Sequence, residues 1–194
     1  CNPEVTYLKA DLGIGSVSFE QINATSPVGE RSYTLYADEI AYVKTNSRYA
    51  ITLSRSTAGE NISRKVWIDW NVDGDFDDAN ELVASEASGG LSFTDSIYVP
   101  KNALLGTTRM RISTNLAGLN NDACGPHMFG EFEDYRIHVS LLNTAPTIAL
   151  SGKTTDTVEV FGTWVDPGFT ANDPQEGDIS GSVLVTNIVN TNEL

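Results

Sequence analysis

The densest group of potential metal ligands follows a Trp-Ile-Asp-Trp segment in the first half of the chain. Six carboxylates and no lysine or arginine lie between Asp69 and Glu81. Crowded like charges repel one another unless a cation lies among them or water screens them. Within this stretch Asp69, Asn71 and Asp73 alternate, and Gly74 follows. This order is typical of loops whose alternate oxygens converge on one hard cation, with glycine allowing a sharp turn.

The predicted ligands are oxygen atoms only, which favours calcium over zinc or copper as the cofactor. The residues that we expect to bind it are Asp69, Asn71, Asp73, Asp75 through its backbone carbonyl, and Glu81. A helix-loop-helix calcium loop has its glutamate at position twelve, and Glu81 lies one residue later, so this loop departs from that motif. The alternative is a water-exposed acidic turn, because Asp, Asn and Gly also favour turns for conformational reasons.

Catalytic motifs are missing from the sequence. It contains no Gly-x-Ser-x-Gly, His-Glu-x-x-His or phosphate-binding loop, and its only histidines are His127 and His138. The carboxylates with a recognisable spacing belong to the acidic loop or to a second motif at residues 130–135. We therefore expect a protein without enzymatic activity.

The two cysteines, Cys1 and Cys124, predict a disulfide formed in an oxidising compartment. Two unrelated thiols are the alternative. The formal net charge of −14 disfavours nucleic acid and anionic membrane surfaces as partners, because both bind proteins largely through lysine and arginine. No stretch is long and apolar enough for membrane insertion.

The elements that must position the acidic loop are short strands. Apolar and polar residues alternate with a period of two at residues 17–22, 33–36, 49–53, 65–70, 91–94, 109–112 and 134–139. Such strands, separated by turn residues, predict an all-β protein with an antiparallel β-sandwich of jelly-roll or immunoglobulin-like type. Residues 79–87 could form a short helix, although we expect strand or loop.

A domain boundary is predicted where residues 140–146 lead into an Ala-Pro pair, giving domains at 1–143 and 144–194. The second domain contains one basic residue, Lys153, and seven acidic ones. It is short for a sandwich of about 100 residues, so it predicts a partial module. Its missing strands could come from a longer parent chain or from self-association at an open sheet edge.

The second motif contains a strand with charged residues on an apolar face. Tyr135, Ile137 and Val139 share the face that we expect in the core, and Glu133 falls on the same face and needs a partner. We therefore predict a structural ion-pair network rather than an acid/base pair. Its expected members are Arg109, Arg111, Glu131, Glu133 and Asp134.

Several motifs resemble one known family. Residues 130–135, Gly-Glu-Phe-Glu-Asp-Tyr, are similar to the Gly-Glu-Val-Glu-Asp-Tyr signature of the GEVED domain, with Phe132 in place of valine. Residues 66–76 resemble the Trp-Ile-Asp-Trp-Asn stretch of that family, and residues 109–111 and Cys124 lie where it has an arginine strand and a cysteine. The resemblance covers about residues 1–141. Residues 144–194 resemble the front part of a bacterial immunoglobulin-like repeat.

The resemblance implies a β-sandwich module of secreted or cell-surface bacterial proteins. We expect a non-catalytic, calcium-stabilised accessory module that binds an extracellular polysaccharide or matrix protein, or mediates adhesion. The aromatic residues that could stack against a ligand are Trp67, Tyr33, Tyr36 and Trp164. The alternative is a structural spacer or filament-forming subunit that binds no small ligand.

Overall fold

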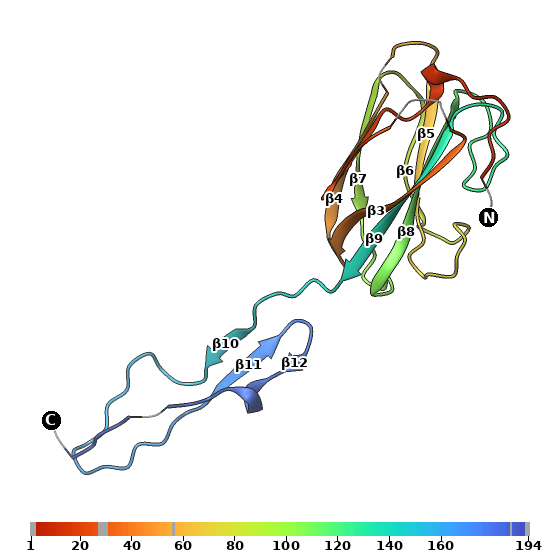
Figure 1. Ribbon diagram of the computed structural model, residues 1–194. Coiled ribbons are helices and arrows are strands. Elements are labelled where there is room, and N and C mark those ends of the chain that lie inside the picture. The colour runs from red at the N-terminus through yellow and green to blue at the C-terminus, as the bar shows by residue number, and fades with distance from the viewer. Residues whose placement is uncertain (1–2, 27–30, 56, 187, 193–194) are drawn as a thin grey trace. The chain divides into compact units, whose positions relative to one another are not determined.

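A computed structural model describes residues 3–26, 31–55, 57–186 and 188–192 of the chain. The chain divides into two compact units, Cys1–Leu142 and Asn143–Leu194. Because the positions of the two units relative to one another are not determined, each unit is described by itself (Figure 1).

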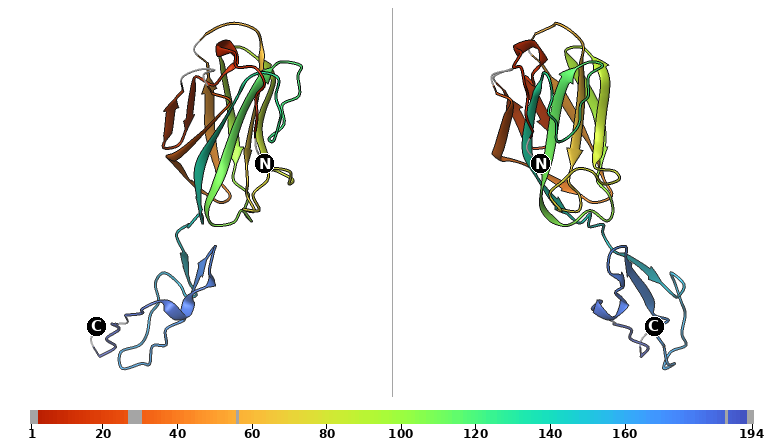
Figure 2. Two further views of the ribbon diagram at one scale, coloured as in Figure 1. Left: turned by 45° about the vertical axis from the view of Figure 1, so that its right-hand side comes forward. Right: turned by 90° about the vertical axis from the view of Figure 1, so that its right-hand side faces the viewer.

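The first unit is a β-sandwich, as predicted, and its two sheets face each other in both views of Figure 2. The smaller sheet has the order β2-β1-β4-β7, with β1 at Ser16–Phe19, β2 at Ile22–Thr25, β4 at Arg48–Ser54 and β7 at Ser92–Tyr98. The larger sheet has the order β3-β9-β8-β5-β6, with β3 at Tyr33–Lys44, β5 at Ile62–Ile68, β6 at Leu82–Gly89, β8 at Gly106–Leu116 and β9 at Glu131–Ser140. A short 3-10 helix, η1, at Ala10–Leu12 precedes them.

The alternating residues of these strands form one hydrophobic core between the sheets. Tyr135, Ile137 and Val139 of β9 are buried there, as their shared face predicts. Ile51 and Leu53 of β4 meet them from the opposite sheet. Burial of such side chains contributes about 1.5–3 kcal/mol each, so this layer holds the sheets together.

Two features of the strand pairing are not apparent from the alternation. β3 runs parallel to β9, with a register shift between Tyr36 and Ile40, whereas the other strand pairs of the described residues are antiparallel. The single strand expected at residues 17–22 is instead two strands joined by a tight turn, in which Glu20 has a φ of 52°. The apolar pattern continues across that turn because β1 and β2 both direct their apolar residues into the core.

The larger sheet is covered on both of its faces. Every residue of β8 from Met110 to Asn115 is buried, although only alternate residues can face the smaller sheet. The loop after β5 and the loop between β8 and β9 cover the outer face, where Trp67, Phe76 and Ala123 form a second apolar cluster. Polar residues of this sheet are therefore enclosed rather than exposed to water.

The second unit is a three-stranded sheet of order β10-β11-β12, followed by the 3-10 helix η2. The bounds are Thr147–Leu150 for β10, Phe169–Asp173 for β11, Gly177–Asp178 for β12 and Ser180–Ser182 for η2. Among its described residues only Ala171 and Asp173 are buried, while Leu184 is 92% exposed. Completion of this unit by further strands stays a prediction.

Candidate metal centre

The acidic loop connects β5 to β6, and backbone contacts hold its two ends together. The Ile68 N–H donates to the Glu81 carbonyl at 2.9 Å, and the Asp69 N–H donates to the Arg109 carbonyl at 3.1 Å. The Trp70 N–H donates to Oε1 of Glu81 at 3.0 Å. The loop therefore begins and ends on two adjacent, hydrogen-bonded strands of the larger sheet.

Within the loop, each alternate side chain accepts a hydrogen bond from the backbone two residues later. Oδ1 of Asn71 accepts from the Asp73 N–H at 3.3 Å, Oδ1 of Asp73 accepts from the Asp75 N–H at 3.2 Å, and Oδ1 of Asp75 accepts from the Asp77 N–H at 3.0 Å. These Asx turns wind the chain tightly, so alternate side chains are brought to one side. Gly74 allows the sharpest bend with a φ of 95°.

The winding brings three carboxylates together. One oxygen each from Asp73, Asp75 and Asp78 lies within 4.8 Å of the other two, an arrangement that could hold a metal ion. Asp73 and Asp75 belong to the predicted ligand set, whereas Asp78 does not. The alternation that predicted the ligands Asp69, Asn71, Asp73 and Asp75 does not include Asp78. The turns of the folded loop bring Asp78 to the cluster instead.

Asn71 joins two members of this cluster. Its side-chain amide nitrogen donates to Oδ2 of Asp73 at 2.8 Å and to Oδ2 of Asp78 at 2.7 Å. Hydrogen bonding, with the Asp75 backbone N–H as the largest contribution, lowers the pKa of Asp73. The Asp73 carboxylate is therefore ionised at neutral pH and available to a cation.

The other two predicted ligands, Asp69 and Glu81, are buried beneath the cluster. Oδ2 of Asp69 accepts from the Gly74 N–H at 3.1 Å, and Oδ1 of Asp69 is buried without a hydrogen-bond partner in the described part of the chain. Glu81 accepts from the backbone N–H groups of Trp70 and Asp78 with its two oxygens, and burial raises its pKa. Glu81 thus ties the two ends of the loop together through its side chain.

A buried ion pair lies next to the loop on the outer face of the larger sheet. Arg111 donates to both oxygens of Asp134, with Nε–Oδ1 and Nη2–Oδ2 distances of 2.7 Å. Arg109 is 3.8 Å from the same carboxylate and donates to the Gly74 carbonyl at 3.1 Å. Each of these guanidinium groups lies 5.1 Å from the centre of the Phe76 ring, so the acidic loop is packed directly onto the ion pair.

The expected pairing of Glu133 with an arginine is wrong, and the strand register explains why. Arg111 lies opposite Asp134 across the β8–β9 ladder, whereas Glu133 lies opposite Ile112 and faces the core. There Glu133 accepts hydrogen bonds from the hydroxyls of Ser26 and Tyr135. Because burial penalises its charged form, the pKa of Glu133 is raised to about 7.

Glu131 also has a structural contact at the start of β9. Its Oε2 accepts from the Ile14 N–H at 3.0 Å and so attaches the amino-terminal segment to the larger sheet. Of the residues predicted for the ion-pair network, Arg109 and Arg111 both pair with Asp134, while Glu131 and Glu133 accept hydrogen bonds from a backbone N–H and from hydroxyls. Residues 63–138 match the GEVED domain.

The GEVED match begins in β5 and ends in β9, so it contains both the acidic loop and the Arg111–Asp134 pair. The predicted resemblance over about residues 1–141 is supported for this segment. The likeness of residues 144–194 to an immunoglobulin-like repeat stays a prediction. No curated protein matches the chain. The described residues contain no helix with the length and apolar character needed to cross a membrane.

One predicted contact of the GEVED segment falls partly outside the described residues. Cys1 is not among them, so the disulfide between Cys1 and Cys124 stays a prediction. Cys124 itself packs against the cluster of Trp67, Phe76 and Ala123 in the loop between β8 and β9.

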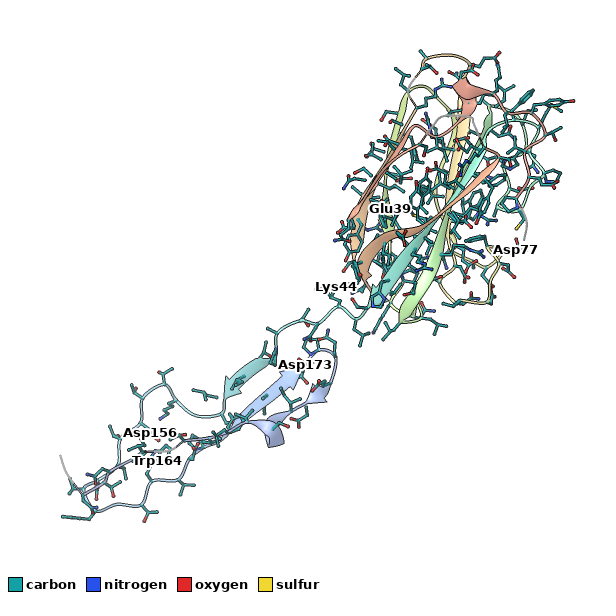
Figure 3. All side chains as sticks on the ribbon, in the orientation of Figure 1. Glu39, Lys44, Asp77, Asp156, Trp164 and Asp173 are labelled. Carbon is teal, nitrogen blue, oxygen red and sulfur yellow. The ribbon has the colours of Figure 1, made fainter. Side chains whose placement is uncertain are left out.

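Trp67, which we expected to be able to stack against a ligand, is only 5% exposed, because it packs against Phe76 and Ala123 of the two loops that cover the outer face. Tyr33 donates to Asp134 at 3.0 Å, and Tyr36 stacks on Tyr135 with the ring centres 5.0 Å apart. Both rings are thus held by structural contacts. Trp164 is half-buried in the second unit, on the long connection between β10 and β11 (Figure 3).

Proposed function

We propose that residues 69–81 bind one calcium ion, and that the first unit is a calcium-stabilised, non-catalytic binding module of a secreted or cell-surface protein. The observation that carries this proposal is the convergence of Asp73, Asp75 and Asp78 within 4.8 Å. Three carboxylates this close repel one another, and a divalent cation between them converts the repulsion into attraction.

The ligand types of the cluster favour calcium. All three groups are carboxylates, and their oxygens suit a hard cation rather than zinc or copper. Calcium accepts about six to eight oxygen ligands in a flexible arrangement, whereas magnesium requires near-ideal octahedral geometry and keeps several of its waters. A loop that offers several carboxylates close together therefore favours the larger ion.

The buried carboxylate of Asp69 supports the same site. Its Oδ1 atom has no hydrogen-bond partner among the described residues, and leaving such an atom buried and unpaired is costly. Its Oδ2 atom holds the Gly74 N–H, which keeps the carboxylate inside the turn. An ion that also contacts Oδ1 would remove this penalty.

The acids of the GEVED signature support a non-catalytic role. Glu133 and Asp134 are fully buried, and their oxygens are engaged by hydroxyls or by Arg111. A general acid or base must reach the proton that it transfers, and these positions do not allow that. The match to the GEVED domain, an accessory module of extracellular proteins, favours the same role.

Direct titration with calcium chloride, measured by isothermal calorimetry on the full chain, tests the proposal. We expect one site per chain, with Asp73→Asn and Asp75→Asn weakening calcium binding at least ten-fold. Asp77→Asn is the matched control, because Asp77 lies in the same loop, carries the same charge and is outside the cluster (Figure 3). Absence of binding heat, or equal loss in all three variants, would contradict a specific site.

A further inference from the structure

Two adjacent cavities lead away from the acidic loop at the end of the sandwich. Their volumes are about 470 and 330 Å³, and Asn80, Pro100 and Asn102 line both of them. One end reaches Asn71 and Asp78 of the acidic loop. Both volumes lie within the range of about 300–1,000 Å³ that small-ligand sites occupy. We call this feature the Pro100 groove.

The far end of the Pro100 groove contains an aromatic ring beside the guanidinium of Arg48. Tyr98 is 40% exposed, and its hydroxyl donates to Oδ1 of Asn46 at 2.8 Å. The Arg48 guanidinium lies 5.2 Å from the centre of the ring. These two contacts fix the ring, so binding against it costs little side-chain entropy. Lys101 lies in the same wall of the groove.

Several polar groups of this groove have no partner of opposite charge and no side-chain hydrogen bond. Within the described chain, Arg48 and Lys101 form no ion pair, and the side-chain amides of Asn80 and Asn102 have no hydrogen-bond partner. Apart from the contact of Arg48 with the Tyr98 ring, these two cations are available to a ligand in a chain whose net charge of −14 repels anions elsewhere. The groove therefore offers an anionic ligand a local attraction.

We propose that the Pro100 groove binds an acidic oligosaccharide, that is, a chain of sugar rings bearing carboxylates. A sugar ring packs against Tyr98, its carboxylate pairs with Arg48 and Lys101, and the amides of Asn80 and Asn102 bind hydroxyl groups. The next acidic ring would lie beside Asp78, where a bound calcium ion would attract its carboxylate. This last contact rests on the proposed calcium site.

An acidic peptide is the alternative ligand, and the position of the strands argues against it. A peptide that adds to a sheet edge needs a run of free backbone groups. Of the strand residues, only Arg48 at the start of β4, Leu82 and Val83 at the start of β6, and Ser96 and Tyr98 near the end of β7 line the groove. The other lining residues belong to loops, which suit a sugar chain better.

Binding of a hexagalacturonate, measured by calorimetry in calcium, tests the inference. We expect Arg48→Ala and Tyr98→Ala each to weaken this binding at least ten-fold while leaving calcium binding unchanged. Lys44→Ala is the control, because this exposed lysine of β3 lies outside the groove (Figure 3). Maltohexaose, which has no carboxylates, should bind at least ten-fold more weakly than the acidic sugar.

The measurements distinguish a failure of the groove assignment from a failure of the proposed calcium site. Calcium binding without hexagalacturonate binding would overturn the groove assignment and leave the metal site intact, as expected for a structural spacer. Hexagalacturonate binding that depends on Arg48 but occurs without any calcium binding would support the groove and overturn the metal site. Equal binding of hexaglutamate would overturn the sugar as the ligand class.

Discussion

Arg111 and Asp134 lie directly opposite one another on β8 and β9, and the guanidinium holds the carboxylate through two hydrogen bonds of 2.7 Å. Both side chains are almost completely buried, at 1% and 0% exposure. Arg111 also donates to the Ala123 carbonyl at 2.9 Å and contacts the Phe76 ring. This pair therefore joins the central strands to the two loops that cover them.

Removing one partner of this pair should destabilise the first unit strongly. Asp134→Ala leaves a buried guanidinium uncompensated, and we expect a loss of about 3–5 kcal/mol in the free energy of unfolding. Urea denaturation followed by tryptophan fluorescence measures this change. Arg136→Ala is the control, because Arg136 is an exposed neighbour on the same strand. A loss below about 1 kcal/mol for Asp134→Ala would show that the pair is dispensable.

Glu133 should make stability depend on pH. Its pKa is raised from 4.5 to about 7 in the folded protein, so between these values the folded state holds a proton that the unfolded chain has released. The free energy of unfolding therefore falls as the pH rises through this window, by on the order of 3 kcal/mol from this group.

Glu133→Gln tests this dependence because it keeps the shape of the side chain and removes its titration. We expect the variant to be more stable than the wild type at pH 8 and of similar stability at pH 4.5. Denaturation curves at several pH values give the difference between the two proteins, in which the other titrating groups cancel. Parallel pH profiles would disprove a raised pKa at Glu133.

Two glycines with similar backbone angles should differ in their tolerance of alanine. Gly130 has a φ of 100°, and an added Cβ would lie 2.0 Å from the Thr114 carbonyl oxygen. Gly74 has a φ of 95°, and nothing lies within 4 Å of an added Cβ. We expect Gly74→Ala to cost about 1–3 kcal/mol from backbone strain alone, and Gly130→Ala to cost clearly more. Thermal unfolding of both variants measures this order, and equal losses would contradict it.

Removal of calcium should lower the melting temperature. An ion that binds only the folded state stabilises it by about 2.7 kcal/mol when its concentration is a hundred times the dissociation constant. We expect a shift of several degrees between calcium and chelator in scanning calorimetry. The shift should fall to about half or less in Asp73→Asn, because a ten-fold weaker site stabilises by only about 1.4 kcal/mol at the same calcium concentration, and it should persist in Asp77→Asn. Identical curves for the wild type in both buffers would argue against a stabilising ion.

The sequence predicted those features that depend on neighbouring residues. The alternation in β9 predicted that Tyr135, Ile137 and Val139 share the core face, because successive side chains of a strand point to opposite faces. The order of Asp69, Asn71, Asp73 and Gly74 predicted a tight acidic turn, because Asx hydrogen bonds span only two residues.

Other features depend on which distant residues meet. Trp67 was expected to be able to stack against a ligand, but two loops more than forty residues apart in the sequence cover it. Sequence reasoning also overlooked Asp78, Arg48 and Tyr98, which carry no motif of their own.

The order of neighbouring residues by itself determined that this chain is an all-β protein with an acidic turn after a Trp-Ile strand. The tertiary structure decided which acid each arginine holds, because the β8–β9 register places Asp134, and not Glu133, opposite Arg111. It also decided which carboxylates converge and where a groove opens beside them. The ion pair, the carboxylate cluster and the groove all depend on strand pairing and loop packing between distant segments. The order of residues along the chain does not specify the register in which distant strands pair.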